Sequence, residues 1–284
     1  MTQYAEVIGD PIAQSKSPAI HNFWIGKLGL DARYGATQVT PVGLSDYLTS
    51  RRGDPDWRGC NVTMPHKLAV LPLLDRLDPL AARIGAVNTI IREADGGLAG
   101  INTDVEGFLE PLQPLLARTH LFRMARVLGA GGAARAIVAA LADRGMVIVL
   151  AARDPAKAQA LLDELTTQDD HHAVALDHFA SPTDFAFDDR AQCLDLIVNA
   201  SPLGMTGQPR LRFDLSHAPP GSVIYDIVTS PERTELLAGA EAAGFRTIDG
   251  LSMLIGQAAT AFEAFFGRPA PRQHDAELRA LLIA

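Results

Sequence analysis

The stretch that decides the fold is Val127-Leu128-Gly129-Ala130-Gly131-Gly132-Ala133-Ala134-Arg135. Here an apolar segment breaks into glycines and restarts as an alanine-rich helix, predicted over residues 133–142. Free backbone N–H groups and the positive end of the helix dipole converge on such a turn, so it can bind a pyrophosphate. Ala134 stands at the third glycine of the dinucleotide-binding fingerprint, a tolerated exchange where the helix packs closely on the strand. Taken alone, the pattern favours a dinucleotide site and a plain tight turn about equally.

The segments after this turn decide between the two interpretations. Residues 146–150 (MVIVL) form a second apolar run at the spacing that a strand–helix–strand unit requires. Residues 194–198 and 223–227 supply two more strands that read as buried. We therefore predict a Rossmann-type domain of the α/β class in this half of the chain, with residues 129–134 against the cofactor.

Length and composition limit what the rest of the chain can be. The 284 residues leave room for about two domains, and 48% hydrophobic with 20% charged residues is ordinary for a soluble globular protein. No apolar run approaches the ~18 residues that span a bilayer, and the N-terminus lacks a basic and then apolar leader. Cys60 and Cys193 form neither a CxxC pair nor a disulfide framework. A cytoplasmic enzyme with packed thiols is expected.

The net charge limits the kinds of partner that the protein is expected to bind. The net charge of -8 and the pI near 5.4 oppose the broad basic face that nucleic acid or an anionic membrane needs. An anionic small molecule remains a suitable partner if local donors hold it. The pair His171-His172 lies in the acidic stretch TQDDHHA, which favours a solvated turn over a metal site. We predict no metal.

Hydroxyl groups gather at the first predicted helix. A strand over residues 5–9 is followed by a dense turn and by a helix with Pro18 in its first turn and Ser17 at its N-cap. Capping alone would explain Ser17, and taken by itself this residue favours that role. Ser15 and Ser17 together, beside a helix N-terminus, also form a compact set of donors for a carboxylate.

A cation and two polar groups converge around residues 59–67. The segment alternates as a strand until Thr63, and Pro65 is expected to open a helix, so Asn61 and Thr63 share one face and Lys67 lies one turn further on. A lysine early in a helix is usually a solvated surface group. Because the charge of Lys67 would slightly oppose the helix dipole, its position suggests a functional role.

A hairpin carries the next polar groups. Residues 84–92 read as a strand that contains Asn88, and the turn at 95–97 leads to a partner strand over 98–101. Asp104 then begins an amphipathic helix with Phe108, Leu112 and Leu115 on one face. Its carboxylate could simply suit the dipole of that helix, and a catalytic role requires Lys67 nearby.

Several of these segments, in this order, resemble the shikimate/quinate dehydrogenase family nearly end to end. The shared motifs are VIGDPIAQSKSPAIHNF (7–23), GCNVTMPHK (59–67), GAVNT (85–89), GINTDVEGF (100–108), LGAGGAARA (128–136), NASPLGM (199–205), YDIV (225–228) and MLIGQAATAF (253–262). Such a set is far more specific than the glycine turn alone.

The resemblance implies a fold and an activity. It implies a three-layer α/β substrate domain over 1–104 and 245–284, a Rossmann-type domain over 105–244, and an active site in the cleft between them, with a pair of helices as hinge. It implies reversible NADP-dependent reduction of 3-dehydroshikimate to shikimate, in the pathway to chorismate and the aromatic amino acids. The chain is then expected to act as a monomer or homodimer.

The resemblance also implies roles for individual residues. Ser15 and Ser17 would hold the substrate carboxylate, and Lys67 with Asp104 would be the catalytic pair. The groups expected to contact the ring or its substituents are Asn61, Thr63, Asn88, Thr229 and Gln257. A glutamine in an apolar helix such as 251–266 is by itself as consistent with a helix–helix contact.

The chemistry independently requires a pair like Lys67 and Asp104. When hydride reaches a ketone carbon, the oxygen becomes alkoxide-like, so a proton donor must stand within hydrogen-bond reach of that oxygen. Our hypothesis is that Lys67 is charged before the hydride arrives and that Asp104 orients it and shares the substrate hydroxyl.

Cofactor preference depends on residues 151–157 (AARDPAK), at the tip of the second Rossmann strand. A basic group there accepts a 2'-phosphate, whereas an acidic group takes a ribose 2'-OH. Arg153 and Lys157 are similar to the family's NADP-binding residues, and Asp154 is more simply the cap of a helix that begins at Pro155. We predict NADP, with NAD as the alternative. By the same resemblance, Ile227 and Gly250 also contact the cofactor.

Two other interpretations stay open. Thr229 replaces a tyrosine that is usual in the family, which leaves a quinate or aminoshikimate dehydrogenase as an alternative, while the intact pair Ser15 and Ser17 favours shikimate. A dinucleotide-binding regulatory protein without turnover is an alternative from another class. Retention of Lys67 and Asp104 speaks against that second alternative.

Overall fold

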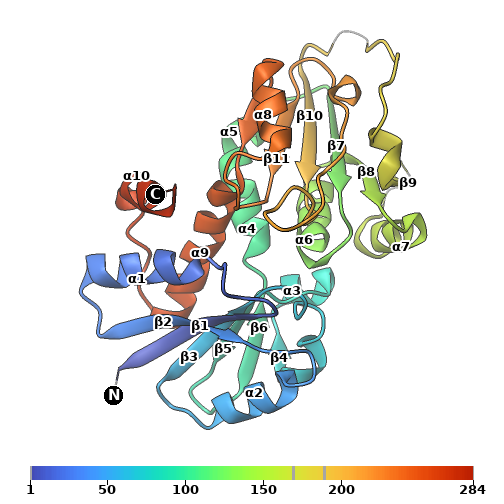
Figure 1. Cartoon of the computed structure of the whole chain (residues 1–284). Coiled ribbons are helices and arrows are strands. Elements are labelled where there is room, and N and C mark those ends of the chain that lie inside the picture. The colour runs from blue at the N-terminus through green and yellow to red at the C-terminus, as the bar shows by residue number, and fades with distance from the viewer. Residues whose placement is uncertain (1, 168–169, 188–189, 284) are drawn as a thin grey trace. The chain divides into compact units, whose positions relative to one another are not determined.

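A computed structural model describes residues 2–167, 170–187 and 190–283 of the chain (Figure 1). It divides into two compact units, one of Met1–Gly107 with Ile255–Ala284 and one of Phe108–Leu254. Both divisions fall inside helices, namely α4 (Asp104–Leu109) and α9 (Gly250–Phe266). The exact domain limits and the hinge stay predictions.

The first unit is built on a mixed six-stranded sheet in the order β2-β1-β3-β5-β6-β4. The strands are β1 (Gln3–Gly9), β2 (Ala32–Gln38), β3 (Trp57–Val62), β4 (Arg76–Leu77), β5 (Thr89–Arg92) and β6 (Leu98–Ile101). β1 pairs in parallel with β2 and β3, whereas β5 runs antiparallel to β3 and β6. Residues 5–9 of β1 are all buried, as expected for a strand that is covered on both faces.

Helices cover both faces of this sheet, with α1 (Ser17–Leu28) and α9 on one side and α2 (Leu44–Arg52) on the other (Figure 1). On the α1 side, His21 and Trp24 lie against Phe262 of α9 in an aromatic cluster. On the other side, Leu44 and Leu48 of α2 belong to the apolar core. The remaining helices of the unit are α3 (Pro79–Ile84) and α10 (Asp275–Ile283), with 3-10 turns at Leu71–Leu73 and Arg272–His274.

The second unit holds a parallel six-stranded sheet in the order β12-β11-β10-β7-β8-β9. The strands are β7 (Phe122–Leu128), β8 (Val147–Ala152), β9 (His172–Ala175), β10 (Cys193–Asn199), β11 (Val223–Asp226) and β12 (Arg246–Ile248). This is the Rossmann order, with the first strand, β7, between β8 and β10. The α/β class with a Rossmann-type unit is therefore confirmed.

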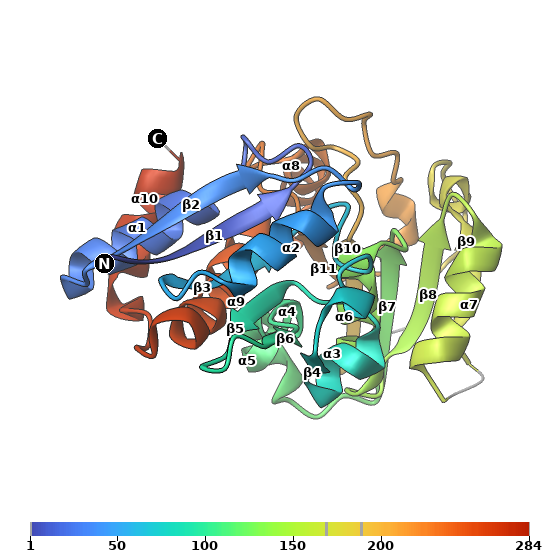
Figure 2. The ribbon, with the colours of Figure 1, turned by 90° about the horizontal axis from the view of Figure 1, so that it is seen from below.

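The glycine turn lies at the carboxyl end of β7, and helices cover both faces of the sheet in this unit. α6 (Gly132–Ala142) follows the turn, and α7 (Pro155–Leu165) lies along β8 and β9 (Figure 2). On the opposite face, Leu237 and Ala240 of α8 (Glu235–Ala242) pack in the core with Ile197. Short elements complete the unit at Glu110–Leu112, Gln113–Leu116, Leu176–Phe179 and Leu215–His217.

The predicted helix from Pro65 is wrong. Residues 64–70 form successive turns, and the carbonyl of Lys67 accepts a hydrogen bond from the Val87 nitrogen at 2.8 Å, outside its own segment. Lys67 is therefore not in the first turn of a helix, and its charge opposes no helix dipole there.

Ser17 is not an N-cap, and this prediction is also wrong. The helix begins at Ser17 itself, its N-cap residue is Lys16, and no side chain caps it. The hydroxyl of Ser15 instead accepts from the Ser17 nitrogen at 3.3 Å, which satisfies one of the free N–H groups at the start of the helix.

Three further local predictions are corrected. The strand expected from residue 84 begins at Thr89, because α3 extends to Ile84 and ends on Gly85 with φ +66°. The single helix expected after Asp104 is divided into α4, a 3-10 turn and α5 (Gln113–Leu116). Each later piece has a proline, which has no N–H to donate, as its second residue. His171 is buried rather than solvated, because its Nδ1 accepts from the Ile148 nitrogen at 3.0 Å.

Candidate active site

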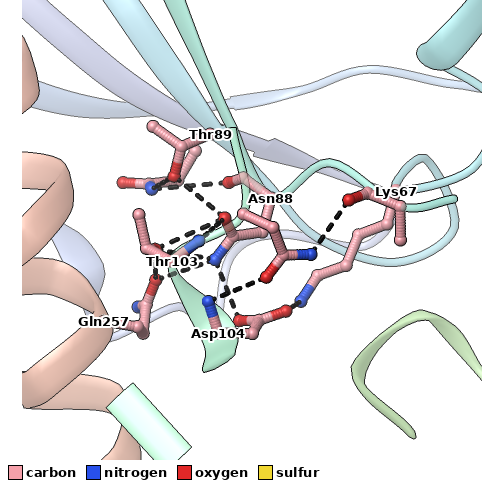
Figure 3. Close-up of polar contacts among 9 residues, drawn as sticks. Lys67, Asn88, Thr89, Thr103, Asp104 and Gln257 are labelled. Atoms are coloured by element: carbon pink, nitrogen blue, oxygen red, sulfur yellow. Dashed lines mark hydrogen bonds and ion pairs between the residues drawn. The ribbon is translucent and has the colours of Figure 1, made fainter. Parts of the chain in front are cut away.

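Lys67 and Asp104 form an ion pair. The Lys67 ammonium donates to Oδ2 of Asp104 at 2.5 Å (Figure 3). Their side chains are 14% and 6% exposed, so the pair is largely withdrawn from solvent yet not sealed. Lys67 comes from the turns after β3 and Asp104 from the first residue of α4. The structure thus brings together the two residues predicted to be catalytic.

The backbone of Asp104 is fixed by its neighbour Asn102. Oδ1 of Asn102 accepts from the Asp104 nitrogen at 3.0 Å, and its amide donates to the Ala86 carbonyl at 2.9 Å. Both asparagine contacts are buried. As a result, the Asp104 carboxylate is presented from a rigid helix start, where a negative charge is also favoured by the dipole.

Asn88 connects this pair to α9. Its amide donates to Oδ1 of Asp104 at 2.9 Å, to the Thr103 hydroxyl at 2.9 Å and, more weakly, toward Oε1 of Gln257 at 3.3 Å (Figure 3). Four predicted residues, Lys67, Asn88, Asp104 and Gln257, therefore belong to one connected cluster. Thr103 joins them, and sequence reasoning missed it although it stands beside Asp104.

Asn61 lies behind this cluster. It is 5% exposed, accepts from the Tyr34 hydroxyl at 2.5 Å and donates to the Thr89 hydroxyl at 2.9 Å. Its polar atoms are thus engaged inside the protein, which favours support of Asn88 over direct contact with a substrate.

Thr63 stands beside the turn that leads to the serines. A Cβ on Gly9 would lie 2.6 Å from Cγ2 of Thr63 and 2.9 Å from the Met64 carbonyl, so the two segments touch where Gly9 has no side chain. The Asp10 nitrogen also donates to the Met64 carbonyl at 3.0 Å. Gly9 therefore allows the loop that carries Ser15 to approach the segment that carries Lys67.

The serines differ in exposure. Ser17 is 5% exposed, and Ser15 is half-buried. Within the described part of the chain, no hydrogen bond from the Ser17 hydroxyl is found, so this hydroxyl is available to a ligand. Lys16, between them, donates to the Leu282 carbonyl in the last turn of α10 at 2.5 Å.

In the second unit, the glycine turn has the shape that a pyrophosphate needs. Gly129 has φ +119°, and a Cβ there would lie 2.9 Å from the Ala200 carbonyl oxygen. Gly131 precedes α6, and no atom lies within 4 Å of the position its Cβ would take. Ala134 is fully buried, as the close packing of α6 requires. The residues present therefore fit a dinucleotide, with the free N–H groups of α6 toward its phosphates.

The loop facing Gly129 is held by Asn199 and Asp226. The amide of Asn199 donates to Asp226 at 2.9 Å and to the Leu203 carbonyl at 3.0 Å. Asp226 also accepts from the Thr234 hydroxyl at 2.7 Å, and burial raises the pKa of its carboxyl. Sequence reasoning did not identify this pair, although the motifs NASPLGM and YDIV contain it.

The other second-unit residues predicted to bind cofactor or substrate differ in their surroundings. Arg153 and Lys157 are exposed, and the Asp154 carboxylate accepts from the Ala156 and Lys157 nitrogens at 3.1 and 3.4 Å, which confirms it as the cap of α7. Gly250 has no room for a side chain because the carbonyls of Ile227 and Val228 press against it. Ile227 and Thr229 are half-buried.

Comparisons with known proteins agree with this arrangement. A family described as the shikimate dehydrogenase substrate binding domain matches residues 7–90, and one described as the shikimate 5'-dehydrogenase C-terminal domain matches residues 250–277. Shikimate dehydrogenase (NADP(+)) of Sphingopyxis alaskensis is 51% identical over 99% of this chain and 97% of its own. The chain belongs to the shikimate dehydrogenase family.

Solved structures of shikimate dehydrogenase family members and related enzymes align with nearly the whole chain. Shikimate 5-dehydrogenase from Thermus thermophilus, in complex with NADP(H) and shikimate, aligns with a TM-score of 0.79 at 34% identity, covering 99% of each chain. Quinate dehydrogenase from Corynebacterium glutamicum, in complex with NAD, aligns with a TM-score of 0.82 at 31% identity, also over 99% of each chain.

Two further observations bear on the kind of site. Among the described residues, no group of three or more His, Cys, Asp or Glu side chains is placed to hold a metal ion. None of the described helices combines the length and apolar character that crossing a membrane requires.

Proposed function

We propose that this chain catalyses the reversible, NADPH-dependent reduction of 3-dehydroshikimate to shikimate, a step toward chorismate and the aromatic amino acids. The observation that carries this proposal is the ion pair of Lys67 and Asp104, set among the amides of Asn88 and Gln257. It unites a proton donor with groups that can recognise ring hydroxyls. The sequence identity to an NADP-dependent shikimate dehydrogenase supports it.

Lys67 supplies the proton in this proposal. When bound, the reduced nicotinamide supplies a hydride to the carbonyl carbon. The Lys67 ammonium donates a proton to the carbonyl oxygen as negative charge develops there, and in the reverse direction its amine accepts the hydroxyl proton. The low exposure of Lys67 and Asp104 strengthens the hydrogen bond from Lys67 to the carbonyl oxygen, because little water competes for the developing charge.

Asp104 and Asn88 set the position of that proton. Oδ2 of Asp104 holds the ammonium and Oδ1 accepts from Asn88, so the carboxylate cannot rotate without losing a hydrogen bond. We assign to Asp104 the orientation of Lys67 and a hydrogen bond to a neighbouring substrate hydroxyl. Asn88, Gln257 and Thr63 are proposed to contact the remaining hydroxyls, and Thr103 supports them.

Ser15 and Ser17 are proposed to bind the substrate carboxylate. Hydroxyl donors at the start of α1 suit an anion, because the helix dipole is positive there. In the second unit, residues 129–134 are proposed to hold the pyrophosphate, with Ile227 and Gly250 near the nicotinamide half. Arg153 and Lys157 are proposed to take the 2'-phosphate, since Asp154 is occupied as a helix cap.

A cytoplasmic location belongs to the same proposal. Both cysteines are free thiols, and Cys60 is buried, as is usual in a reducing compartment. A monomer or homodimer stays our expectation for its assembly.

One assay tests the proposed function. Shikimate and quinate are each offered with NADP and NAD, and reduction of the cofactor is followed by its absorbance. We expect kcat/KM to be greatest for shikimate with NADP. Faster turnover of quinate than of shikimate would identify the protein as a quinate dehydrogenase, the alternative that Thr229 leaves open. Absence of turnover with either acid would overturn the proposal.

A further inference from the structure

A chain of hydrogen bonds runs from the interior of the first unit to the Asp104 carboxylate. The Tyr34 hydroxyl lies 2.5 Å from Oδ1 of Asn61, and the Asn61 amide lies 2.9 Å from the Thr89 hydroxyl. That hydroxyl lies 3.1 Å from Oδ1 of Asn88, whose amide reaches Asp104 at 2.9 Å. This series of hydrogen bonds begins at Tyr34 on β2, crosses β1 to reach β3 and continues to β5.

Two backbone groups show which end of the Asn88 side chain and of the Asn61 side chain is the donor. Oδ1 of Asn88 faces the Thr103 nitrogen at 2.8 Å, and because a backbone N–H can only donate, the other end of this side chain must be the amide that faces Asp104. In the same way, Asn61 faces the Asn88 carbonyl at 3.4 Å, which can only accept. Asn61 therefore turns its amide toward residues 88 and 89 and its oxygen toward Tyr34.

Two hydroxyl protons complete the chain. The Thr89 hydroxyl accepts from the Asn61 amide, so its single proton is left to donate to Asn88. The Tyr34 hydroxyl faces an amide oxygen and must donate to it. All donors thus point one way, from Tyr34 toward the carboxylate that holds Lys67.

Tyr34 is itself held firmly. Its ring stacks on His21 with centroids 4.0 Å apart and planes within 4°. The Asn22 side chain bonds both backbone groups of Tyr34, accepting from its nitrogen at 3.0 Å and donating to its carbonyl at 2.8 Å. The hydroxyl therefore cannot turn away from Asn61 without disturbing α1.

We propose that Tyr34 is a positioning residue for the reaction. Its hydroxyl keeps the Asn61 amide aimed at Thr89, and thereby keeps the Asn88 amide aimed at Asp104, although Tyr34 touches neither substrate nor cofactor. This inference rests on the proposed function, in which Asn88 and Asp104 contact the substrate. Loss of the Tyr34 hydroxyl leaves the buried oxygen of Asn61 without its donor, which favours a rearranged Asn61.

Kinetics of four variants test this positioning role. Tyr34→Phe and Thr89→Val each remove one link, and we expect each to lower kcat/KM for shikimate about five- to tenfold, the loss of one buried hydrogen bond. The dissociation constant for NADPH should stay unchanged. Because both changes interrupt one chain, the double variant should fall little further than the worse single variant. Thr89→Ser keeps the hydroxyl and should retain wild-type kcat/KM.

Tyr47→Phe is the matched control. Tyr47 is a partly buried tyrosine of the same unit, on α2 across the sheet. Loss of its hydroxyl should leave kcat/KM within about twofold, the scale of experimental scatter, because Tyr47 is not part of this series of hydrogen bonds. A folded Tyr34→Phe variant with wild-type kcat/KM would overturn the proposal, as would multiplicative losses in the double variant. If Tyr34→Phe does not fold, equal kcat/KM of Thr89→Val and Thr89→Ser would overturn it instead. Wild-type turnover of shikimate, measured alongside, separates these failures from failure of the proposed function.

Discussion

The Lys67 ammonium and the Asp104 carboxylate are in contact at 2.5 Å, in a place where neither side chain is more than 14% exposed. An ion pair this shielded from water interacts more strongly than a surface pair, but removing either charge leaves the other one buried and unpaired. Removing the cation therefore affects both chemistry and folding, and the two effects can be separated.

Lys67→Met should lower kcat about 10²- to 10⁴-fold, the usual range for loss of a general acid. Affinity for NADPH should not change, because Lys67 is not among the residues proposed to bind it. The variant should also have a lower Tm, since the buried Asp104 carboxylate loses its cation. The double variant with Asp104→Asn should recover Tm without recovering kcat. Near-normal turnover of Lys67→Met would remove Lys67 from the mechanism.

Gly129 and Gly131 should respond differently to alanine. Gly129→Ala places a Cβ 2.9 Å from the Ala200 carbonyl at φ +119°, so we expect a lower Tm even without cofactor. Gly131→Ala meets no atom within 4 Å and has φ -91°, so Tm should be kept while KM for NADPH rises at least several-fold, because the methyl group enters the space proposed for phosphate. Unchanged KM in Gly131→Ala would place the pyrophosphate elsewhere.

Arg153 should determine the preference for NADP. Arg153→Ala removes an exposed guanidinium, and we expect kcat/KM for NADP to fall about tenfold, as for loss of one charge-assisted contact, with that for NAD nearly unchanged. Asp154→Asn should raise kcat/KM for NADP slightly while keeping Tm, because asparagine also caps a helix. Equal losses with both cofactors in Arg153→Ala would contradict the assignment.

Lys16 should tune substrate affinity through the C-terminal helix. Its ammonium caps the last turn of α10 at the Leu282 carbonyl and thereby fixes the loop between Ser15 and Ser17. Lys16→Met should raise KM for shikimate about three- to tenfold, the effect of one charge-assisted hydrogen bond, and leave KM for NADPH unchanged. Lys27→Met removes the same charge from a more exposed pair between α1 and α10, with Glu277, and serves as control. If the two variants raise KM equally, general electrostatics rather than the loop is responsible.

Features that depend on local sterics could be predicted from the sequence. The glycine turn at 129–132 was predictable because backbone geometry and helix packing demand small residues there, and the Asp154 cap because a short acidic side chain precedes Pro155. The pairing of Lys67 with Asp104, in contrast, joins residues far apart in the chain. It followed from the family resemblance and not from spacing.

Features that depend on distant hydrogen bonds could not be predicted. The segment after Pro65 has a helical pattern, yet the Lys67 carbonyl bonds Val87. The buried position of His171 depends on a bond to Ile148. The role of Thr103 depends on its contact with Asn88, and that of Tyr34 on its contact with Asn61 two strands away in the sheet. Polar residues of this kind look like ordinary strand or loop residues in the sequence.

His21 should make the protein less stable in mild acid. Burial lowers its pKa to about 3, and neither ring nitrogen has a hydrogen-bond partner among the residues described. The unfolded chain takes up a proton at this residue below about pH 6.5, whereas the folded protein does not until near pH 3, so stability falls as the pH drops through this window. At pH 5 the loss amounts to about 2 kcal/mol relative to neutral pH.

His21→Phe removes this proton uptake while keeping an aromatic ring against Tyr34, so urea unfolding of the variant should lose about 2 kcal/mol less than the wild type between pH 7.5 and pH 5. His172→Gln, a change at an exposed histidine, should reproduce the wild-type dependence. Comparing the differences between the two pH values cancels the constant effect of each substitution on packing, as well as the protonation of carboxylates common to all three proteins. Parallel stability curves for wild type and His21→Phe would mean that His21 takes up its proton in the folded state as readily as in the unfolded one.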